Sequence, residues 1–191
     1  MKHLNLLYKF YRFLVCKRQH IHYETLPSAD FSVETFNCNN GTIHFGRNVY
    51  LRSNVSVRNL QRHSIIEFGD NTDIGRGTTL SCYNKIIMHN NVLTGPYVFI
   101  SDHNHKYTDI SKPVMYQGIE FEKNSRVEIC DGVWIGTNAV IVGNVRIGRN
   151  SVIAANSVVN KDVPDFCVVA GAPAKIIKRY DMNTCQWIKI K

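Results

Sequence analysis

The stretch VEICDGVWIGTNAVIVGNVRIGRNSVIAANSVV, residues 127–159, places a large apolar residue at every sixth position. The members of this series are Ile129, Ile135, Ile141, Ile147, Ile153 and Val159. A period of six is neither the 3.6 of an α-helix nor the 2 of an alternating strand. It is typical of a solenoid of short parallel strands, in which three six-residue units close one triangular coil around large aliphatic side chains.

Two further series extend the pattern toward the N-terminus. One comprises Phe68, Ile74, Leu80, Ile86, Val92 and Val98, and a shorter one comprises Phe45, Leu51 and Val57. The Ile and Val bias agrees with strand. The sequence therefore predicts an all-β coil over residues 41–180 with an excursion loop at 104–127. A helical or irregular segment at 1–40 precedes it, and a short helical tail at 181–191 follows it.

The first twenty residues have the pattern of an amphipathic helix. Leu4, Leu7, Tyr11 and Leu14 share one helical face, and basic residues lie elsewhere. Packing on the protein or on a sister subunit is the simpler role, and weak peripheral contact with an anionic membrane surface is the alternative. The segment is a poor signal peptide and is too short to span a bilayer. We therefore expect a cytoplasmic protein, at the inner face of the membrane if the alternative holds.

The net charge and the cysteine spacing limit the possible partners and the cellular compartment of the protein. The 191 residues carry a formal net charge of +8, and the basic residues gather near both ends of the chain. Nucleic acid, an anionic membrane or a phosphate-rich ligand would each suit this charge, but nucleic-acid binding leaves the repeats unexplained. The six cysteines are scattered without a Cys-x-x-Cys pair, so free thiols in a reducing compartment are expected rather than a zinc knuckle or a disulfide framework.

The coil resembles that of the left-handed β-helix, hexapeptide-repeat acyltransferases. Residues 127–179, with the marks WIG, NSVVNKDVP and GAPAKIIK, are similar to maltose and galactoside acetyltransferases and to polysaccharide O-acetyltransferases. The resemblance covers about residues 42–180. It implies a left-handed coil, acetyl-CoA as co-substrate, a saccharide acceptor, and a homotrimer whose active sites lie between subunits.

The stretch SDHNHKYTD, residues 101–109, stands where the repeat stops. A polar excursion of this length in a compact solenoid is usually functional. His103 and His105 at its root can be read as metal ligands, as inert turn residues or as a general base. A metal would need a third converging ligand, which the spacing of the other histidines does not supply. A general base suits an imidazole of near-neutral pKa, so we expect no metal.

The resemblance favours His105 as the base, because the histidine of the sugar acetyltransferases lies nine residues after a proline, as His105 lies after Pro96. His103, which is closer to the regular coil, is the second choice. An acidic residue would orient the imidazole, and the sequence leaves four candidates open: Asp102, Asp109, Glu120 and Glu122. The preceding stretch TTLSCYNKI lacks a clear counterpart of the family's acceptor-binding asparagine, so the acceptor pocket is expected to differ.

The same resemblance assigns the coenzyme A contacts. They fall on Thr137, Ala155, Asn160, Lys161, Lys175 and Lys178, with Arg179 as an addition. The basic C-terminal cluster independently suits phosphate. A backbone N–H in the WIGTN coil would stabilise the oxyanion, and Trp134 would form a wall of the pocket or pack against a neighbouring subunit.

The function expected from these features is transfer of acetyl from acetyl-CoA to a sugar hydroxyl in bacterial surface-polysaccharide synthesis, either lipopolysaccharide or capsule. Three alternatives remain at this level. They are N-acetylation of an amino sugar, a zinc hydratase of the carbonic anhydrase type, and a non-catalytic scaffold.

Overall fold

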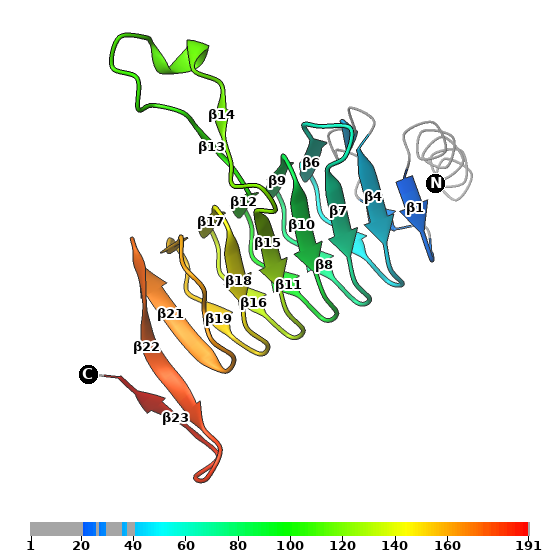
Figure 1. The fold of residues 1–191 in the computed structure, drawn as a ribbon. Coiled ribbons are helices and arrows are strands. Elements are labelled where there is room, and N and C mark those ends of the chain that lie inside the picture. The colour runs from blue at the N-terminus through cyan, green and yellow to red at the C-terminus, as the bar shows by residue number, and fades with distance from the viewer. Residues whose placement is uncertain (1–20, 26, 30–35, 38–40, 191) are drawn as a thin grey trace.

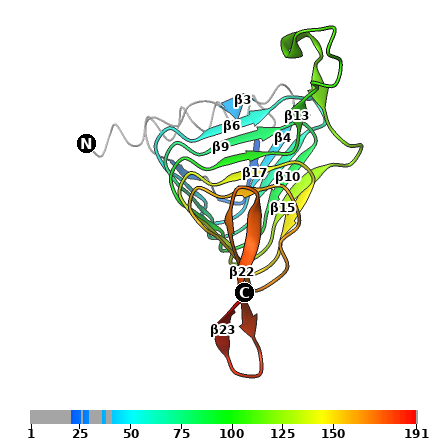
Figure 2. The ribbon, with the colours of Figure 1, turned by 90° about the vertical axis from the view of Figure 1, so that its left-hand side faces the viewer.

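The computed structural model describes residues 21–25, 27–29, 36–37 and 41–190. This part of the chain coils into a parallel β-solenoid whose three sheets enclose a triangular core (Figures 1 and 2). Its only helical element is the 3₁₀ turn η1, Val114–Tyr116, and none of its helices is long and apolar enough to cross a bilayer. The helix expected in the first twenty residues lies outside the described residues.

Each coil contributes one strand to each of the three sheets. The first sheet contains β1 (Ile21–Tyr23), β4 (Thr42–Phe45), β7 (Ile65–Phe68), β10 (Lys85–Met88), β15 (Arg126–Ile129) and β18 (Val145–Ile147). The second contains β2 (Ser28–Ala29), β5 (Tyr50–Leu51), β8 (Asp73–Ile74), β11 (Leu93–Thr94), β16 (Trp134–Ile135), β19 (Val152–Ile153), β21 (Cys167–Gly171), β22 (Ala174–Asp181) and β23 (Gln186–Lys189). The third contains β3 (Phe36–Asn37), β6 (Ser56–Asn59), β9 (Thr79–Cys82), β12 (Phe99–Ser101), β17 (Val140–Val142) and β20 (Val158–Val159).

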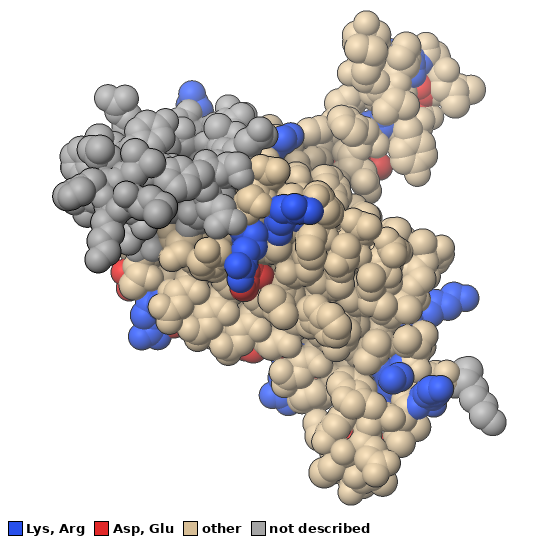
Figure 3. All heavy atoms as spheres, turned by 180° about the vertical axis from the view of Figure 1, so that it is seen from behind, with Lys and Arg blue, Asp and Glu red and all other residues tan. Residues whose placement is uncertain are grey.

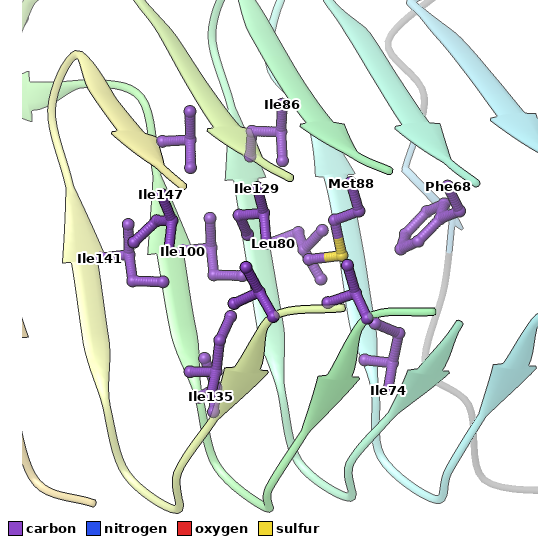
Figure 4. Packing of buried hydrophobic residues seen from close by; sticks show 14 of the residues in the cluster. Phe68, Ile74, Leu80, Ile86, Met88, Ile100, Ile129, Ile135, Ile141 and Ile147 are labelled. Atoms are coloured by element: carbon purple, nitrogen blue, oxygen red, sulfur yellow. The ribbon is translucent and has the colours of Figure 1, made fainter. Parts of the chain in front are cut away.

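The residues of the six-step series fill the interior, as predicted. Ile129, Ile135 and Ile141 come from three different sheets of one coil, and all three side chains are fully buried (Figure 4). Every other member of the three series is also buried. Removing such a side chain from water stabilises the fold by about 1.5–3 kcal/mol. The aliphatic column therefore holds the coils in place.

The prediction located the interior correctly but misaligned one series. Strands β7 and β10 each have two inward-facing residues, and Phe68 aligns with Met88 whereas Ile66 aligns with Ile86. The step of six from Leu80 therefore falls on Ile86, two residues before the true equivalent of Phe68. The cause is the turn at Tyr83, which is longer than a hexapeptide turn. Both inward positions are apolar here, and the spacing alone does not distinguish them.

Two of the three corners are short turns of nearly constant form. We call the corner between the first and second sheets the first corner, and the corner between the second and third sheets the second. Asn71 and Asn91 in the first corner have positive φ, as does Asn138 in the second. Asparagine tolerates this conformation better than other residues with a side chain. The Asn71 side chain donates a hydrogen bond to that of Asn91, which links successive coils.

The C-terminal end corrects the prediction, because residues 181–189 form a β-hairpin and not a helical tail. Strand β22 pairs antiparallel with β21 and with β23, and its residues alternate in exposure with the period of a strand. The turn is fixed by Asp181, whose carboxylate accepts hydrogen bonds from the Asn183 N–H and the Thr184 hydroxyl. Such local bonds favour a turn over a helix.

Candidate active site

The third corner, between the third and first sheets, takes up the variation in coil length. Val127 and Val145 are register partners 18 residues apart, which is the length of three hexapeptides. Lys85 and Arg126 are register partners 41 residues apart. The additional residues lie between β12 and β15, so the excursion is an insertion at one corner of an otherwise continuous stack.

The excursion forms an arm that projects from the coil (Figure 1). Its stem is the antiparallel pair of β13 (Asn104–His105) and β14 (Ile119–Glu120). Beyond the stem, Ile110, Met115 and Tyr116 are strongly exposed. On the face seen in Figure 3, the arm at the upper right carries a few charged side chains among uncharged ones. Exposed apolar side chains of this size suit a contact with another surface.

Asp102 anchors the root of the arm to the preceding coil. Its carboxylate is buried, and it accepts hydrogen bonds from the backbone N–H groups of Tyr83, Asn84 and Lys85 at 2.7, 2.6 and 2.7 Å. Three N–H donors compensate the cost of burying this charge. The turn at Tyr83, which shifts the register of the repeat, therefore also supplies the three N–H donors that bind this carboxylate.

His103 lies beside that carboxylate. Its Nδ1 is 3.1 Å from Oδ1 of Asp102 and 3.2 Å from the Ser101 hydroxyl, which donates to the His103 carbonyl. Because a carboxylate only accepts hydrogen bonds, the contact with Asp102 favours a proton on Nδ1. In the neutral ring of this tautomer, Nε2 carries the lone pair that can accept a proton.

A cavity of about 290 Å³ opens at the root of the arm, and its lining includes His103, Asn104, Glu120, Phe121, Glu122 and Asn144. The Tyr83 and Phe121 rings lie 4.4 Å apart, and Tyr83 also lies 5.8 Å from the His103 ring. An imidazole, carboxylates, amides and an aromatic wall thus meet at one place. A site of this composition suits a small polyhydroxylated molecule.

The other histidine and aspartate of the excursion lie elsewhere. His105 is exposed on β13, where it is the register partner of Ile119, and it is not among the residues that line the cavity. Asp109 lies further along the arm and accepts hydrogen bonds from the Ser111 N–H and hydroxyl, which lower the pKa of its carboxyl. Of the four candidate orienting acids, Asp102 makes the contact with an imidazole.

The residues assigned to the acyl donor divide between two corners and the C-terminal hairpin. Asn160 and Lys161 are exposed at the third corner, two coils beyond His103. Thr137 and Ala155 are exposed at the second corner, on successive coils. Lys175, Lys178 and Arg179 lie on β22. Strand β17 separates Thr137 from the third corner of its own coil, a path of about 20 Å.

The WIGTN coil holds Trp134 on its outer face and leaves one backbone amide as the better oxyanion donor. Trp134 is half exposed and is flanked in register by Leu93 and Val152. The N–H groups of Trp134, Gly136 and Asn138 all donate to neighbouring coils. The N–H of Thr137 is not among these donors, so it suits the oxyanion role better than they do.

The three buried thiols among the described residues are poor nucleophiles. Burial raises the pKa of Cys82, and the nearby Asp102 charge raises it further. Burial likewise raises the pKa of Cys130 and of Cys167. A thiol is reactive as its thiolate, which these environments disfavour.

One trio of ligand-type side chains lies across the first sheet from the cavity. His89, Glu128 and Cys130 have donor atoms within 4.8 Å of one another. Arg126 already pairs with Glu128 at 3.0 Å. The expectation that the site needs no metal remains a prediction.

The sequence did not indicate several residues around His103. Ser101, Tyr83, Phe121 and Asn144 contact or enclose the site, but none stands in a recognisable spacing. The one available signal was the irregular stretch around Tyr83, which marked a departure from the repeat without indicating its role. Contacts such as Tyr83 N–H to Asp102 join residues 19 apart in adjacent coils, and only the folded stack brings them together.

A hexapeptide coil whose interrupted corner holds an imidazole against a buried carboxylate defines a class of group-transfer enzymes. Residues 126–161 match the family model "Bacterial transferase hexapeptide (six repeats)". The chain is 35% identical over 156 residues to WbbJ, ascribed to lipopolysaccharide biosynthesis as an O-acetyl transferase in Escherichia coli (strain K12), with 79% of each protein covered. It is 31% identical over 137 residues to the galactoside O-acetyltransferase of Lactococcus lactis, covering 72% of this chain and 53% of that enzyme.

The fold is shared with a solved structure of low identity. AntD, an N-acyltransferase from Bacillus cereus solved with dTDP and 3-hydroxybutyryl-CoA, superposes with a TM-score of 0.71 at 17% identity, covering 91% of this chain and 90% of AntD. The identity and coverage shared with WbbJ are high enough to show which protein family the chain belongs to. The chain belongs to the hexapeptide-repeat acetyltransferases, and it is an enzyme of that family.

Proposed function

We propose that the protein transfers acetyl from acetyl-CoA to a hydroxyl of a saccharide, in the synthesis of a bacterial surface polysaccharide. The observation that carries this proposal is His103 in the wall of the cavity, with Nδ1 3.1 Å from the buried Asp102 carboxylate. The names of WbbJ and of the galactoside enzyme support an O-linked product and a saccharide acceptor. AntD, bound to an acyl-CoA, supports the donor class.

The mechanism follows from the free Nε2 of His103. The acceptor hydroxyl gives its proton to Nε2 as its oxygen bonds to the thioester carbonyl carbon. The tetrahedral intermediate then collapses with cleavage of the C–S bond, and the departing sulfur takes the proton from the imidazolium. General-base catalysis of this kind contributes about 10²- to 10⁴-fold. The Asp102 charge stabilises the imidazolium between the two transfers.

This proposal gives the base to His103 and not to His105, which the count from Pro96 favoured. Only His103 has its ring nitrogen against a buried carboxylate in the described part of the chain. His105 would have to reach the cavity from an exposed position on β13. The two histidines can be separated by mutation.

We expect a second subunit to complete the donor slot. In one protomer Thr137 and His103 lie at different corners, on either side of the third sheet, so a donor held at Thr137 cannot meet that protomer's own base. A trimer would bring the second corner of one subunit to the third corner of the next. The exposed Phe99 on the third sheet and the exposed apolar side chains of the arm suit such packing. Lys161, about two strand spacings or ~10 Å from His103 along the stack, would attract the phosphates.

The remaining elements of the proposal follow from the resemblance. They are the left-handed sense of the coil, a cytoplasmic location, and weak membrane contact through the first twenty residues. The basic residues of β22, Lys175, Lys178 and Arg179, would contribute to the charge around the donor. The raised pKa of the Cys82 thiol agrees with direct transfer without a covalent acyl-enzyme.

N-acetylation of an amino sugar is the second candidate, and the likeness to AntD favours it, because AntD is an N-acyltransferase. The same base and donor slot would serve. Acceptor profiling with matched hydroxyl and amino sugars separates the two reactions.

The test is release of free thiol from acetyl-CoA by the purified protein with a panel of saccharides. We expect saccharide-dependent release that H103A reduces at least 100-fold, whereas H105A retains most of the activity. The H105A variant is the matched control, because both histidines lie at the root of the arm. The proposal is wrong if no saccharide or amino sugar releases thiol, or if H103A is fully active.

A further inference from the structure

We infer that the acceptor cavity selects saccharides without a negative charge, and that Glu120 and Glu122 determine this specificity. The inference rests on the proposed function for the identity of the site, and it adds the chemical class of the acceptor. Among the described residues that line the cavity, three are acidic and none is Lys or Arg. A ligand in this cavity therefore meets acidic side chains and no Lys or Arg in its walls.

The two glutamates differ from the third acid, Asp102. The Asp102 charge is compensated by three backbone N–H groups and by the His103 contact. Glu122 accepts only a neutral hydrogen bond, from the Asn144 side chain at 3.2 Å. Neither Glu120 nor Glu122 forms an ion pair with a residue in the described part of the chain. Their charges are thus available to the ligand.

Three basic side chains near the cavity are already engaged, and Lys106 and Lys123, for which the described residues show no ion pair, do not line it. Lys85 pairs with Glu67 at 3.0 Å, Lys112 with Asp109 at 3.2 Å, and Arg126 with Glu128 at 3.0 Å. A carboxylate or phosphate on the acceptor would therefore face Glu120 and Glu122 without a free cation from these strands. At about 5 Å, between surface and bulk dielectric values, such repulsion lowers binding about 4-fold to 250-fold.

The same wall suits a neutral sugar ring. Phe121 lies between the two glutamates in the chain, and its ring packs against Tyr83 at 4.4 Å. An aromatic surface receives the C–H face of a pyranose, and carboxylates accept hydrogen bonds from its hydroxyl groups. An amino sugar in its cationic form would also be attracted. The preferred acceptor is thus a neutral or amino-substituted pyranose and not a uronic, sialic or phosphorylated one.

The experiment compares methyl glycosides with the matching methyl uronides in the gluco, galacto and manno series, which differ at C6 in charge. Acetyl transfer is measured as kcat/KM, and binding is measured separately by saturation-transfer NMR without acetyl-CoA. For wild type we expect the neutral member of at least one pair to be preferred at least 10-fold in both measurements. In the double variant E120Q/E122Q, use of the uronide should rise and bring the ratio close to 1. The control E24Q, at an exposed residue directly after β1, should keep the wild-type ratio.

The outcomes separate the two claims. If thiol release is absent for every saccharide while the neutral glycosides still bind 10-fold better than the uronides, the proposed function fails and the charge selectivity stands. If uronides are used or bound as well as their neutral partners, the inference is overturned. It is also overturned if no member of any pair binds, or if E120Q/E122Q folds and leaves the ratio unchanged.

Discussion

Replacing Asp102 with Asn tests the three backbone hydrogen bonds that attach the root of the arm to the preceding coil. The Asp102 carboxylate accepts three backbone N–H groups, one at Oδ1 and two at Oδ2. An amide has a single acceptor oxygen. If that oxygen takes the place of Oδ2, the amide NH₂ points at the Tyr83 N–H and leaves this donor unpaired in a buried position. The substitution changes little in volume, so the effect isolates hydrogen bonding and charge.

The magnitude follows from these bonds. A buried donor without a partner costs about 1–3 kcal/mol, and the two remaining bonds lose the strength that an ionised acceptor gives, about 1 kcal/mol each. The expected loss is therefore about 3–5 kcal/mol. For a chain of this size each kcal/mol lowers the Tm by about 2–4 °C, so D102N should melt about 6–20 °C below wild type.

Thermal unfolding at fixed protein concentration, followed by circular dichroism, measures this difference. The matched control is D109N, because Asp109 also accepts N–H and hydroxyl hydrogen bonds but lies half-exposed on the arm. Its Tm should change by no more than about 2 °C. A D102N variant that melts within 2 °C of wild type would refute the reasoning, since the buried carboxylate would then not hold the corner.

Three further predictions concern the coil itself. Ile135→Ala should destabilise the protein by about 2–5 kcal/mol in denaturant titration, because its side chain is fully buried in the core; a loss below 1 kcal/mol would contradict this packing. Gly75→Ala should lower the Tm more than Gly118→Ala, because an added Cβ at Gly75 meets the backbone of Gly95, whereas at Gly118 it meets open space and only the positive φ opposes it; equal Tm losses would refute the close approach. The pKa of His44 is lowered from 6.5, first by burial and then by the stacked His22 ring at 4.9 Å. The folded state therefore favours neutral His44, and its contribution to stability is full above pH 6.5 and is lost as the pH falls. Between pH 7.5 and 5.5 the Tm of wild type should then fall further than that of H44Q, and parallel curves would refute the assignment.

The interior of the coil could be predicted from the sequence because each corner and each face repeats within six residues. The rule is local, so counting along the chain finds Ile129, Ile135 and Ile141 together. It failed at Ile86, where a longer turn changed the register while both inward positions stayed apolar. It could not describe the hairpin of β22 and β23, because that end of the chain leaves the repeat and follows ordinary antiparallel pairing instead.

For the proposed base, the sequence leads to a pair of histidines, His103 and His105. Counting nine residues from Pro96 favours His105, but the count assumes that the chain continues as a regular coil. In the structure the chain leaves the coil after β12, and His103 is the imidazole that stays beside the stack. What distinguishes the two is a carboxylate held by N–H groups of the preceding coil, and no spacing within the stretch 101–109 carries that information.

The position of the insertion explains how a regular stack can carry an inserted site. At the first and second corners the turns are short, and glycines such as Gly75 and Gly136 lie so close to the next coil that a Cβ would meet its backbone. An insertion there would separate the strands on both sides. At the third corner the coils already differ in length, and the strands resume in register after 41 residues as they do after 18. Additional chain at this corner therefore costs mainly loop-closure entropy, which rises slowly with length. The arm, the acidic cavity and His103 all arise at the one corner where the stack tolerates them.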